Sequence, residues 1–200
     1  MHTESDWFRY YSLDGYEEII EGELPQEEVE LEPVDANLFP DHLEIFTDGE
    51  EGFTPEQYND GGSVNWSYVI EEDTAHDTVV EFNSSSTQQV SYFAADAGGV
   101  DLRAYEGGTI TFDMKVVQQP SSDADWMFKV ECYHPCQSVE LTIGTQADFP
   151  IDIWQPITVN IAELTGLDLS TVNNTLVVFP TWGGSDGAIY RIDNLFWNKP

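Results

Sequence analysis

The sequence has 200 residues, of which 40% are hydrophobic and 13% aromatic, so it holds enough apolar side chains for one globular domain with an additional segment. Lysine and arginine number 6 against 38 aspartate and glutamate residues, which gives a formal net charge of −32. A surface of this charge repels phosphate backbones and anionic lipid headgroups, so nucleic acids and membrane surfaces are poor candidates as partners.

The N-terminal part is the most acidic region of the chain. Residues 1–60 contain 19 of the 38 acidic residues and a single base, Arg9. Residues 12–41 are rich in glutamate and interrupted by prolines, and clustered like charges disfavour a packed core. We therefore predict that residues 1–41 form an acidic linker or arm. The aromatic segment DWFRYYS at 6–12 departs from this composition, and we interpret it as the last strand of an upstream domain or a strand of this one.

From residue 42 onward the sequence predicts a domain made of β-strands. Short runs rich in β-branched and aromatic residues recur every 10–15 residues and are separated by Gly, Asp, Ser, Asn and Pro. Ten such runs lie at 42–49, 63–73, 77–85, 89–96, 108–119, 125–133, 138–144, 155–164, 175–184 and 188–197. A helical turn is indicated only after residue 160. This spacing predicts an all-β domain over 42–200, a jelly-roll β-sandwich of two antiparallel sheets.

Alternating side chains show which face of a strand is buried. In residues 109–116 hydrophobic side chains alternate with polar ones that include Lys115, and in 126–132 they alternate with a set that includes Lys129. Successive side chains of a strand point to opposite faces, so we expect these lysines to lie on the outer faces of the sheets.

Cys132 and Cys136 are separated by four positions, with Pro135 between them to bend the chain. A bend of this kind suits a short disulfide loop, whose Cα atoms must approach each other closely. We expect a disulfide, with free thiols as the alternative. A zinc site would need about four ligands, and adding His134 fits no familiar spacing. A disulfide would place the protein in an oxidising compartment.

Most motifs for catalysis are absent from the sequence. It contains no phosphate-binding glycine loop and no HExxH. Its four histidines are scattered, and the abundant carboxylates leave a glycosidase pair open but do not indicate one. We therefore predict a domain that is not an enzyme, with a small lyase or hydrolase on the same scaffold as a further hypothesis.

Several residues instead suit the binding of sugars. An aromatic ring can stack on the apolar face of a sugar, while neighbouring polar groups bond to its hydroxyls. The candidates are Tyr92, Trp126, Lys129, Tyr133, Trp182 and Arg191. The alternatives are burial in the core for an aromatic residue and an ion pair with the abundant acids for a base. Trp182 differs from the others because it follows Pro180 and precedes two glycines, where a strand becomes a loop.

Asp193 lies inside the last predicted strand, where aspartate is disfavoured. It shares a face with Arg191, with which it could form a simple ion pair. If the first and last strands are neighbours, Glu44 and Asp48 would come near it. Calcium takes six to eight oxygen ligands, so acidic strand ends suit it. We expect a calcium site formed by Glu44, Asp48 and Asp193, although the spacing matches no EF-hand.

Three stretches carry a resemblance to a known family: VDLRAYEGGTITFDMKVV, WMFKVECYHPCQSVELTI and LVVFPTWGGSDGAIYRIDNLFW. Together they resemble the ExoP-type, galactose-binding-like β-sandwich attached to marine glycoside hydrolases of families 3 and 16. The resemblance covers about residues 42–198. It implies a carbohydrate-binding module with a structural calcium, in which Asp193 matches the calcium-binding aspartate near the C-terminus. It also makes residues 6–12 look like the end of a family 16 catalytic domain.

These observations lead to a functional hypothesis. We expect a non-catalytic module of a secreted polysaccharide-degrading enzyme, which binds a β-glucan such as laminarin or a related marine polysaccharide. Its partners would be the polysaccharide and a covalently linked catalytic domain. The alternative is a structural or interaction domain that stabilises the hydrolase without binding sugar. The opening residues show no signal peptide, so the chain either stays inside the cell or is part of a longer exported protein; we expect an extracellular location, with the periplasm or cell surface as variants.

Overall fold

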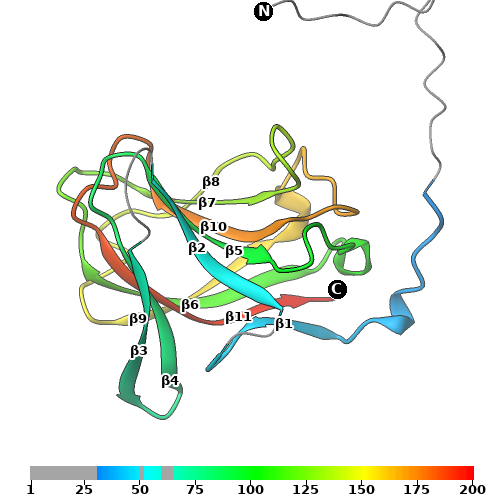
Figure 1. Ribbon diagram of the computed structural model, residues 1–200, viewed down its shortest axis with the longest axis horizontal. Helices are drawn as coiled ribbons and strands as arrows, with labels where there is room; N and C mark the ends of the chain where they lie inside the picture. The colour runs from blue at the N-terminus through cyan, green and yellow to red at the C-terminus, as the bar shows by residue number, and fades with distance from the viewer. Residues whose placement is uncertain (1–30, 50–51, 60–64) are drawn as a thin grey trace, which may run out of the picture. The chain divides into compact units, whose positions relative to one another are not determined.

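Two antiparallel sheets stack face to face in the computed structural model, which describes residues 31–49, 52–59 and 65–200 (Figure 1). Contacts group the described residues from Val34 onward into one unit. The predicted segment at 6–12 and most of the predicted arm lie outside the described residues. The all-β sandwich that the strand spacing predicts is confirmed.

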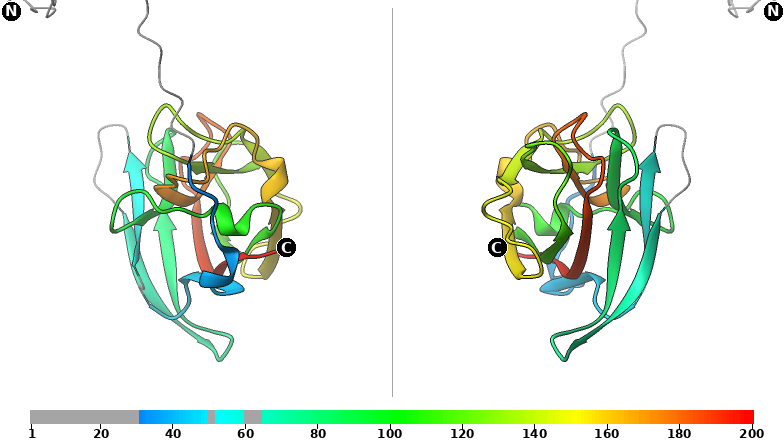
Figure 2. Two further views of the ribbon diagram at one scale, coloured as in Figure 1. Left: turned by 90° about the vertical axis from the view of Figure 1, so that its right-hand side faces the viewer. Right: turned by 90° about the vertical axis from the view of Figure 1, so that its left-hand side faces the viewer.

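The first sheet has six strands. Its order is β3–β4–β11–β6–β9, and β1 also pairs with β11. The strands are β1 His42–Phe46, β3 Trp66–Asp73, β4 His76–Asn83, β6 Thr109–Gln118, β9 Trp154–Asn160 and β11 Ile189–Asn198. Strands β3 and β4 pair as far as Asp73 and His76, whereas β11 pairs with β4 only from Val80 to Asn83. The β3–β4 hairpin therefore extends past its neighbours (Figures 1 and 2).

The second sheet has five strands in the order β2–β5–β10–β7–β8. They are β2 Phe53–Asn59, β5 Gln89–Ala95, β7 Trp126–Glu131, β8 Leu141–Gly144 and β10 Asn174–Pro180. The described residues also form three single-turn helices: η1 Ala36–Leu38 before β1, η2 Arg103–Tyr105 between β5 and β6, and η3 Ile161–Glu163 between β9 and β10. In the described part of the chain, no helix is long and apolar enough to cross a membrane.

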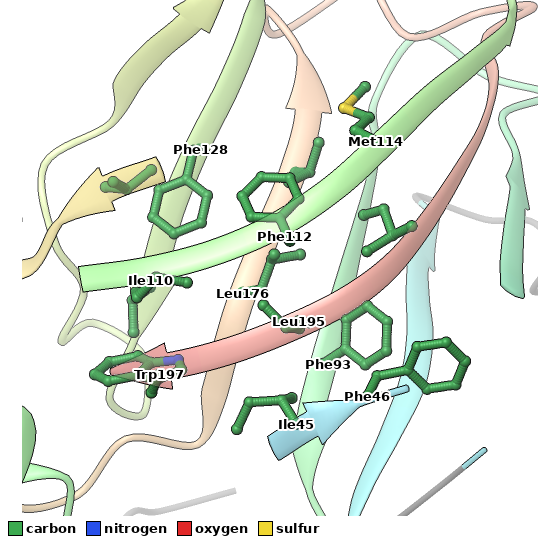
Figure 3. Packing of buried hydrophobic residues seen from close by; sticks show 14 of the residues in the cluster. Ile45, Phe46, Phe93, Ile110, Phe112, Met114, Phe128, Leu176, Leu195 and Trp197 are labelled. Carbon is green, nitrogen blue, oxygen red and sulfur yellow. The ribbon is translucent and has the colours of Figure 1, made fainter. Parts of the chain in front are cut away.

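The main hydrophobic core lies between the two sheets, and it is formed by the inward side chains that alternation predicts. In β6 and β7 the inward positions are 0–1% exposed. Phe112 and Phe128 meet across the core with their ring centroids 6.0 Å apart, and Trp197 closes one end (Figure 3). Large-to-small substitutions of such residues cost about 2–5 kcal/mol, so this layer dominates the stability of the domain.

Strand β2 is absent from the predicted elements. Its sequence contains Pro55, which cannot donate a ladder hydrogen bond and which argues against a central strand. The strand is nevertheless compatible with proline because it lies at the edge of the five-stranded sheet and pairs only with β5. The outer position of β2 in the sheet, which the sequence does not reveal, explains the omission.

Candidate functional site

The outer face of the five-stranded sheet carries a second hydrophobic cluster, separate from the main core. Strand β10 is apolar on both faces: Leu176 and Val178 point into the main core, whereas Val177 and Phe179 belong to the second cluster. Val90 completes the buried part, and two partly buried side chains, Tyr92 and Met127, pack against it. We call this surface, with the polar residues that border it, the outer five-stranded face.

The strand register places the members of this face side by side. Val177 of β10 lies opposite Tyr92 of β5 on one side and Lys129 of β7 on the other. In the next row toward the end of β10, Phe179 lies opposite Met127. Cross-strand neighbours of this kind are about 5 Å apart, so an aromatic ring, an aliphatic side chain and an amine form one continuous surface.

Lys129 is held in this surface by two oxygen atoms. Its Nζ donates to Gln137 Oε1 at 2.8 Å and lies 2.8 Å from Glu131 Oε1. The amine also lies 5.5 Å from the centroid of the Trp182 ring and 5.9 Å from that of Phe179. Because the residue is only 5% exposed, it supports the aromatic side chains and is not an open donor for hydroxyl groups.

Trp182 is the exposed aromatic residue at the end of β10, with 47% of its surface accessible. Its ring packs on Phe179 with a centroid separation of 4.7 Å, and its indole Nε1–H donates to Glu140 Oε1 at 2.8 Å. The chain turns immediately afterward at Gly183, whose φ of 84° is the left-handed conformation that favours glycine. The glycine pair therefore allows the tight turn that leaves Trp182 just beyond the end of β10.

Tyrosines extend the aromatic surface toward β2. Tyr92 lies opposite Glu56 of β2, and Tyr58 of β2 is 53% exposed. Burial, followed by the nearby carboxylates of Glu56 and Glu131, raises the pKa of the Tyr92 phenol above its ordinary value. The hydroxyl of Tyr92 therefore stays protonated at neutral pH and can donate a hydrogen bond.

Two of the predicted sugar-binding residues do not belong to this face. Trp126 is 0% exposed and packs inside the sandwich, with its ring 4.9 Å from that of Tyr190. Arg191 lies on the outer face of the other sheet, where its guanidinium contacts Glu71 and Glu81 at 2.6 Å each. The structure corrects both expectations. Trp126 belongs to the hydrophobic core, and Arg191 forms ion pairs with acidic residues.

Cys132 and Cys136 form the predicted disulfide, with their Cα atoms 4.9 Å apart. Tyr133 lies in this loop and is 52% exposed. Its backbone has a φ of 64°, and its hydroxyl accepts a hydrogen bond from the Gly99 N–H at 2.5 Å. Tyr133 therefore lies beyond the end of β7, where it joins the disulfide loop to the loop after β5.

The acidic residues predicted to bind calcium are partly brought together. Strand β1 pairs with β11, as the hypothesis required, and Asp193 is 1% exposed with Oδ1 lacking a hydrogen-bond partner among the described residues. Burial raises the pKa of Asp193 to about 6, and the carboxylates of Asp48 and Asp113 add to this effect. Glu44 instead accepts a hydrogen bond from the Thr47 hydroxyl.

A metal site is thus incomplete in the part of the chain that the structure describes. There, no group of three or more His, Cys, Asp or Glu side chains is arranged to hold a metal ion. Asp193 has the buried, unpaired oxygen expected of a ligand, whereas Asp48 Oδ1 accepts from the Thr78 N–H at 3.1 Å. Asp193 and Asp48 fit a cation in part, and the calcium site with Glu44 stays a prediction.

Sequence reasoning missed several residues of the outer five-stranded face, among them Tyr58, Met127, Gln137, Glu140 and Phe179. The run LVVFP of β10 is apolar at every position. An uninterrupted apolar strand is the mark of a strand covered on both faces, so this signal was present for Phe179. No comparable signal exists for Gln137 and Glu140, which reach the face only through the path of the chain after the disulfide.

Comparison with known proteins gives relatives in structure only. No family model matches the sequence, and no curated protein matches it either. The extra C-terminal domain of the exo-1,3/1,4-β-glucanase ExoP from a Pseudoalteromonas species is 12% identical, with a TM-score of 0.56 over 78% of this chain and 92% of that domain.

Two further solved structures are similar to this chain. A family 30 carbohydrate-binding module is 14% identical, with a TM-score of 0.55 over 80% of this chain and 88% of that chain. The ExoP enzyme as a whole is 11% identical, with a TM-score of 0.59 over 98% of this chain and 25% of the enzyme. At these identities the similarity establishes the fold: the chain has the β-sandwich fold shared by the ExoP extra domain and this carbohydrate-binding module.

Proposed function

We propose that the β-sandwich is a non-catalytic carbohydrate-binding module and that its ligand lies on the outer five-stranded face. The observation that carries this proposal is Trp182, a half-exposed tryptophan whose ring is backed by Phe179 and bonded to Glu140. A ring fixed in this way offers one flat surface to a sugar without further ordering on binding. Tyr58 and Tyr92 supply additional rings on the same sheet.

The polar residues of this face favour an uncharged polysaccharide, and we propose a β-glucan of the laminarin type or a related marine polysaccharide. Glu56 and Glu131 are acceptors for sugar hydroxyl groups, whereas an anionic polymer would meet the like charge of these residues and of Glu140. Among the described residues, Lys129 is the base that contacts this face, and Glu131 already neutralises it.

The module would work as part of a secreted polysaccharide-degrading enzyme, linked covalently to a catalytic domain. The disulfide supports an oxidising, extracellular compartment. A single shallow face gives modest affinity, and linkage to a catalytic domain increases the effective concentration of enzyme on the polymer. The similarity in fold to the ExoP extra domain supports this arrangement.

The test is calorimetric titration of the 200-residue chain with laminarin, mixed-linkage glucan and a wider panel of neutral polysaccharides. We expect binding to at least one β-glucan and a loss of about 30-fold in affinity for Trp182→Ala, since truncating a central aromatic contact costs about 2 kcal/mol. Trp154→Ala is the matched control, because Trp154 lies on the other sheet and stacks on His76. That control should bind as the wild type does.

Absence of binding across the panel would contradict the proposal. The domain would then be a structural or interaction domain, whose removal destabilises the attached hydrolase without changing its attachment to insoluble polymer. Release of sugar from an oligosaccharide panel by the isolated chain would instead show that the domain is catalytic.

A further inference from the structure

The segment that follows β7 runs close to the outer five-stranded face, and its backbone is fixed at several points. We call residues 132–140 the bridging segment. The disulfide closes its first turn, in which the Cys132 N–H donates to the Cys136 carbonyl at 3.0 Å. The Ser138 N–H donates to the Val130 carbonyl at 2.9 Å, and Ser138 Oγ accepts from the Val130 N–H at 3.1 Å. The bridging segment is therefore anchored to the strand that carries Lys129.

Two side chains of the bridging segment reach the groups that define the face. Gln137 Oε1 accepts from Lys129 Nζ, and Glu140 Oε1 accepts from the Trp182 indole, each at 2.8 Å. The amine of Lys129 in turn lies 5.5 Å from the centroid of the Trp182 ring. These contacts join the bridging segment, β7 and the loop after β10, although Glu140 and Trp182 are 42 residues apart in the sequence.

The contact with Glu140 decides the orientation of an otherwise weakly restrained side chain. Trp182 follows the end of β10 and precedes a glycine pair, so its local backbone does little to fix the ring. Phe179 supports the ring through a tilted contact, and a ring–ring contact is less directional than a hydrogen bond. The hydrogen bond to a carboxylate adds direction and is stronger than one to a neutral acceptor.

We propose that Glu140 is a positioning residue that fixes the Trp182 ring for binding, and that Gln137 does the same for the Lys129 amine beside it. This inference rests on the proposed function, because it assigns Trp182 to the ligand. Glu140 acts through Trp182 and does not itself contact the sugar. Its contribution is the ordering of the ring before binding, which lowers the entropy lost on association.

The experiment compares Glu140→Ala, Glu140→Gln and the control Glu106→Ala, which removes an exposed carboxylate after η2. Affinity for the β-glucan is measured by calorimetry. In parallel, the hydrogen exchange of the Trp182 indole N–H is measured by 15N NMR without ligand, with the signal assigned from Trp182→Phe. We expect Glu140→Ala to lose about fivefold in affinity, the size of one hydrogen bond, and to speed indole exchange.

The glutamine variant separates positioning from charge. Its amide oxygen still accepts from the indole, so Glu140→Gln should keep most of the affinity and retain slow exchange, and Glu106→Ala should match the wild type. Unchanged indole exchange in Glu140→Ala would overturn the inference whether or not the protein binds sugar. Faster exchange with unchanged affinity would also overturn it. Absence of binding in the wild type would contradict the proposed function, and then Glu140 would have no role in binding.

Discussion

The outer faces of the two sheets differ in how accessible their aromatic residues are, although both pair their bases with acids. On the six-stranded sheet, Glu71 forms ion pairs with Lys115 and Arg191, and the Lys115 amine lies 5.0 Å from the centroid of the Trp154 ring. The ring of His76 stacks on Trp154 with a centroid separation of 4.1 Å. On the five-stranded sheet, Lys129 is likewise paired with Glu131 and lies near Trp182, but Trp182 stays half exposed.

This difference shows that outward-facing aromatic and basic residues do not by themselves indicate a binding face. The ion pairs of the six-stranded sheet hold neighbouring strands together, so their loss should affect stability. The outer five-stranded face has an aromatic surface with polar neighbours arranged around it, so substitutions on this face should affect binding. The predictions below test whether stability and binding separate in this way.

The largest expected effect follows from the removal of Glu71. Glu71→Ala leaves Lys115 and Arg191 without their shared partner at positions 9% and 20% exposed, and breaking such a buried contact costs about 3 kcal/mol. Urea denaturation should show this loss, and affinity for polysaccharide should not change. Glu72→Ala removes the exposed neighbour and is the control. A weakened affinity in Glu71→Ala would show that the two faces are coupled.

The second effect concerns the calcium ion that the sequence analysis predicts at Glu44, Asp48 and Asp193. A calcium ion present at 100 times its dissociation constant stabilises the fold by about 2.7 kcal/mol. Exhaustive chelation should therefore lower Tm by about 5–10 °C, and added calcium should restore it. Asp193→Asn should no longer respond to calcium. Equal melting curves before and after chelation would exclude a structural calcium ion.

The charge of the ligand should affect its affinity for the outer five-stranded face. A sulfated derivative of the bound glucan meets the carboxylates of Glu56, Glu131 and Glu140, so we expect about tenfold weaker affinity, about 1.4 kcal/mol. Salt at 0.1 M limits the range of electrostatic interactions to about 10 Å, so the difference in affinity between the neutral and the sulfated glucan should shrink as salt is added. Titrations of both glucans at two salt concentrations measure this difference. Stronger binding of the sulfated polymer would place the ligand elsewhere.

A smaller effect follows from the protonation of Glu71. Burial acts to raise the pKa of this carboxyl, but hydrogen bonds from Lys115 and Arg191 outweigh it, so the pKa lies below its ordinary value. A lowered pKa contributes stability that is present above about pH 4.5 and is lost as the pH falls through the folded value. The stability difference between the wild type and Glu71→Gln should therefore shrink below pH 4.5 in urea denaturation. A difference that is constant between pH 7 and pH 3 would contradict this assignment.

Much of the fold could be predicted because strand period and turn residues are local properties. The ten predicted runs each contain a strand, and the buried positions of β6 and β7 follow from alternation. Strand β2 was not predicted because its Pro55 is tolerated only in an edge strand, and the edge position follows from pairing with β5 alone. The disulfide could also be predicted, since Cys132 and Cys136 are close in sequence.

The candidate site was less predictable because it depends on which strands become neighbours. Trp182 was identified from its place before a glycine pair. Trp126 was misassigned as a sugar-binding residue although alternation in β7 places it on the inward face with Phe128 and Val130. Arg191 and Lys129 look alike in sequence, each alternating with apolar residues. Only their cross-strand neighbours distinguish an ion pair with Glu71 from a contact with Trp182.

The sequence alone determined the all-β class and the inward side of most strands, favoured the disulfide and made Trp182 a candidate for an exposed ring, because each rests on residues within about ten positions of one another. The tertiary structure decided which sheet carries the aromatic face, that Arg191 is neutralised and that Glu140 and Gln137 support Trp182 and Lys129. These relations join residues from different strands and loops. Sheet order and register set them, and no local pattern encodes either.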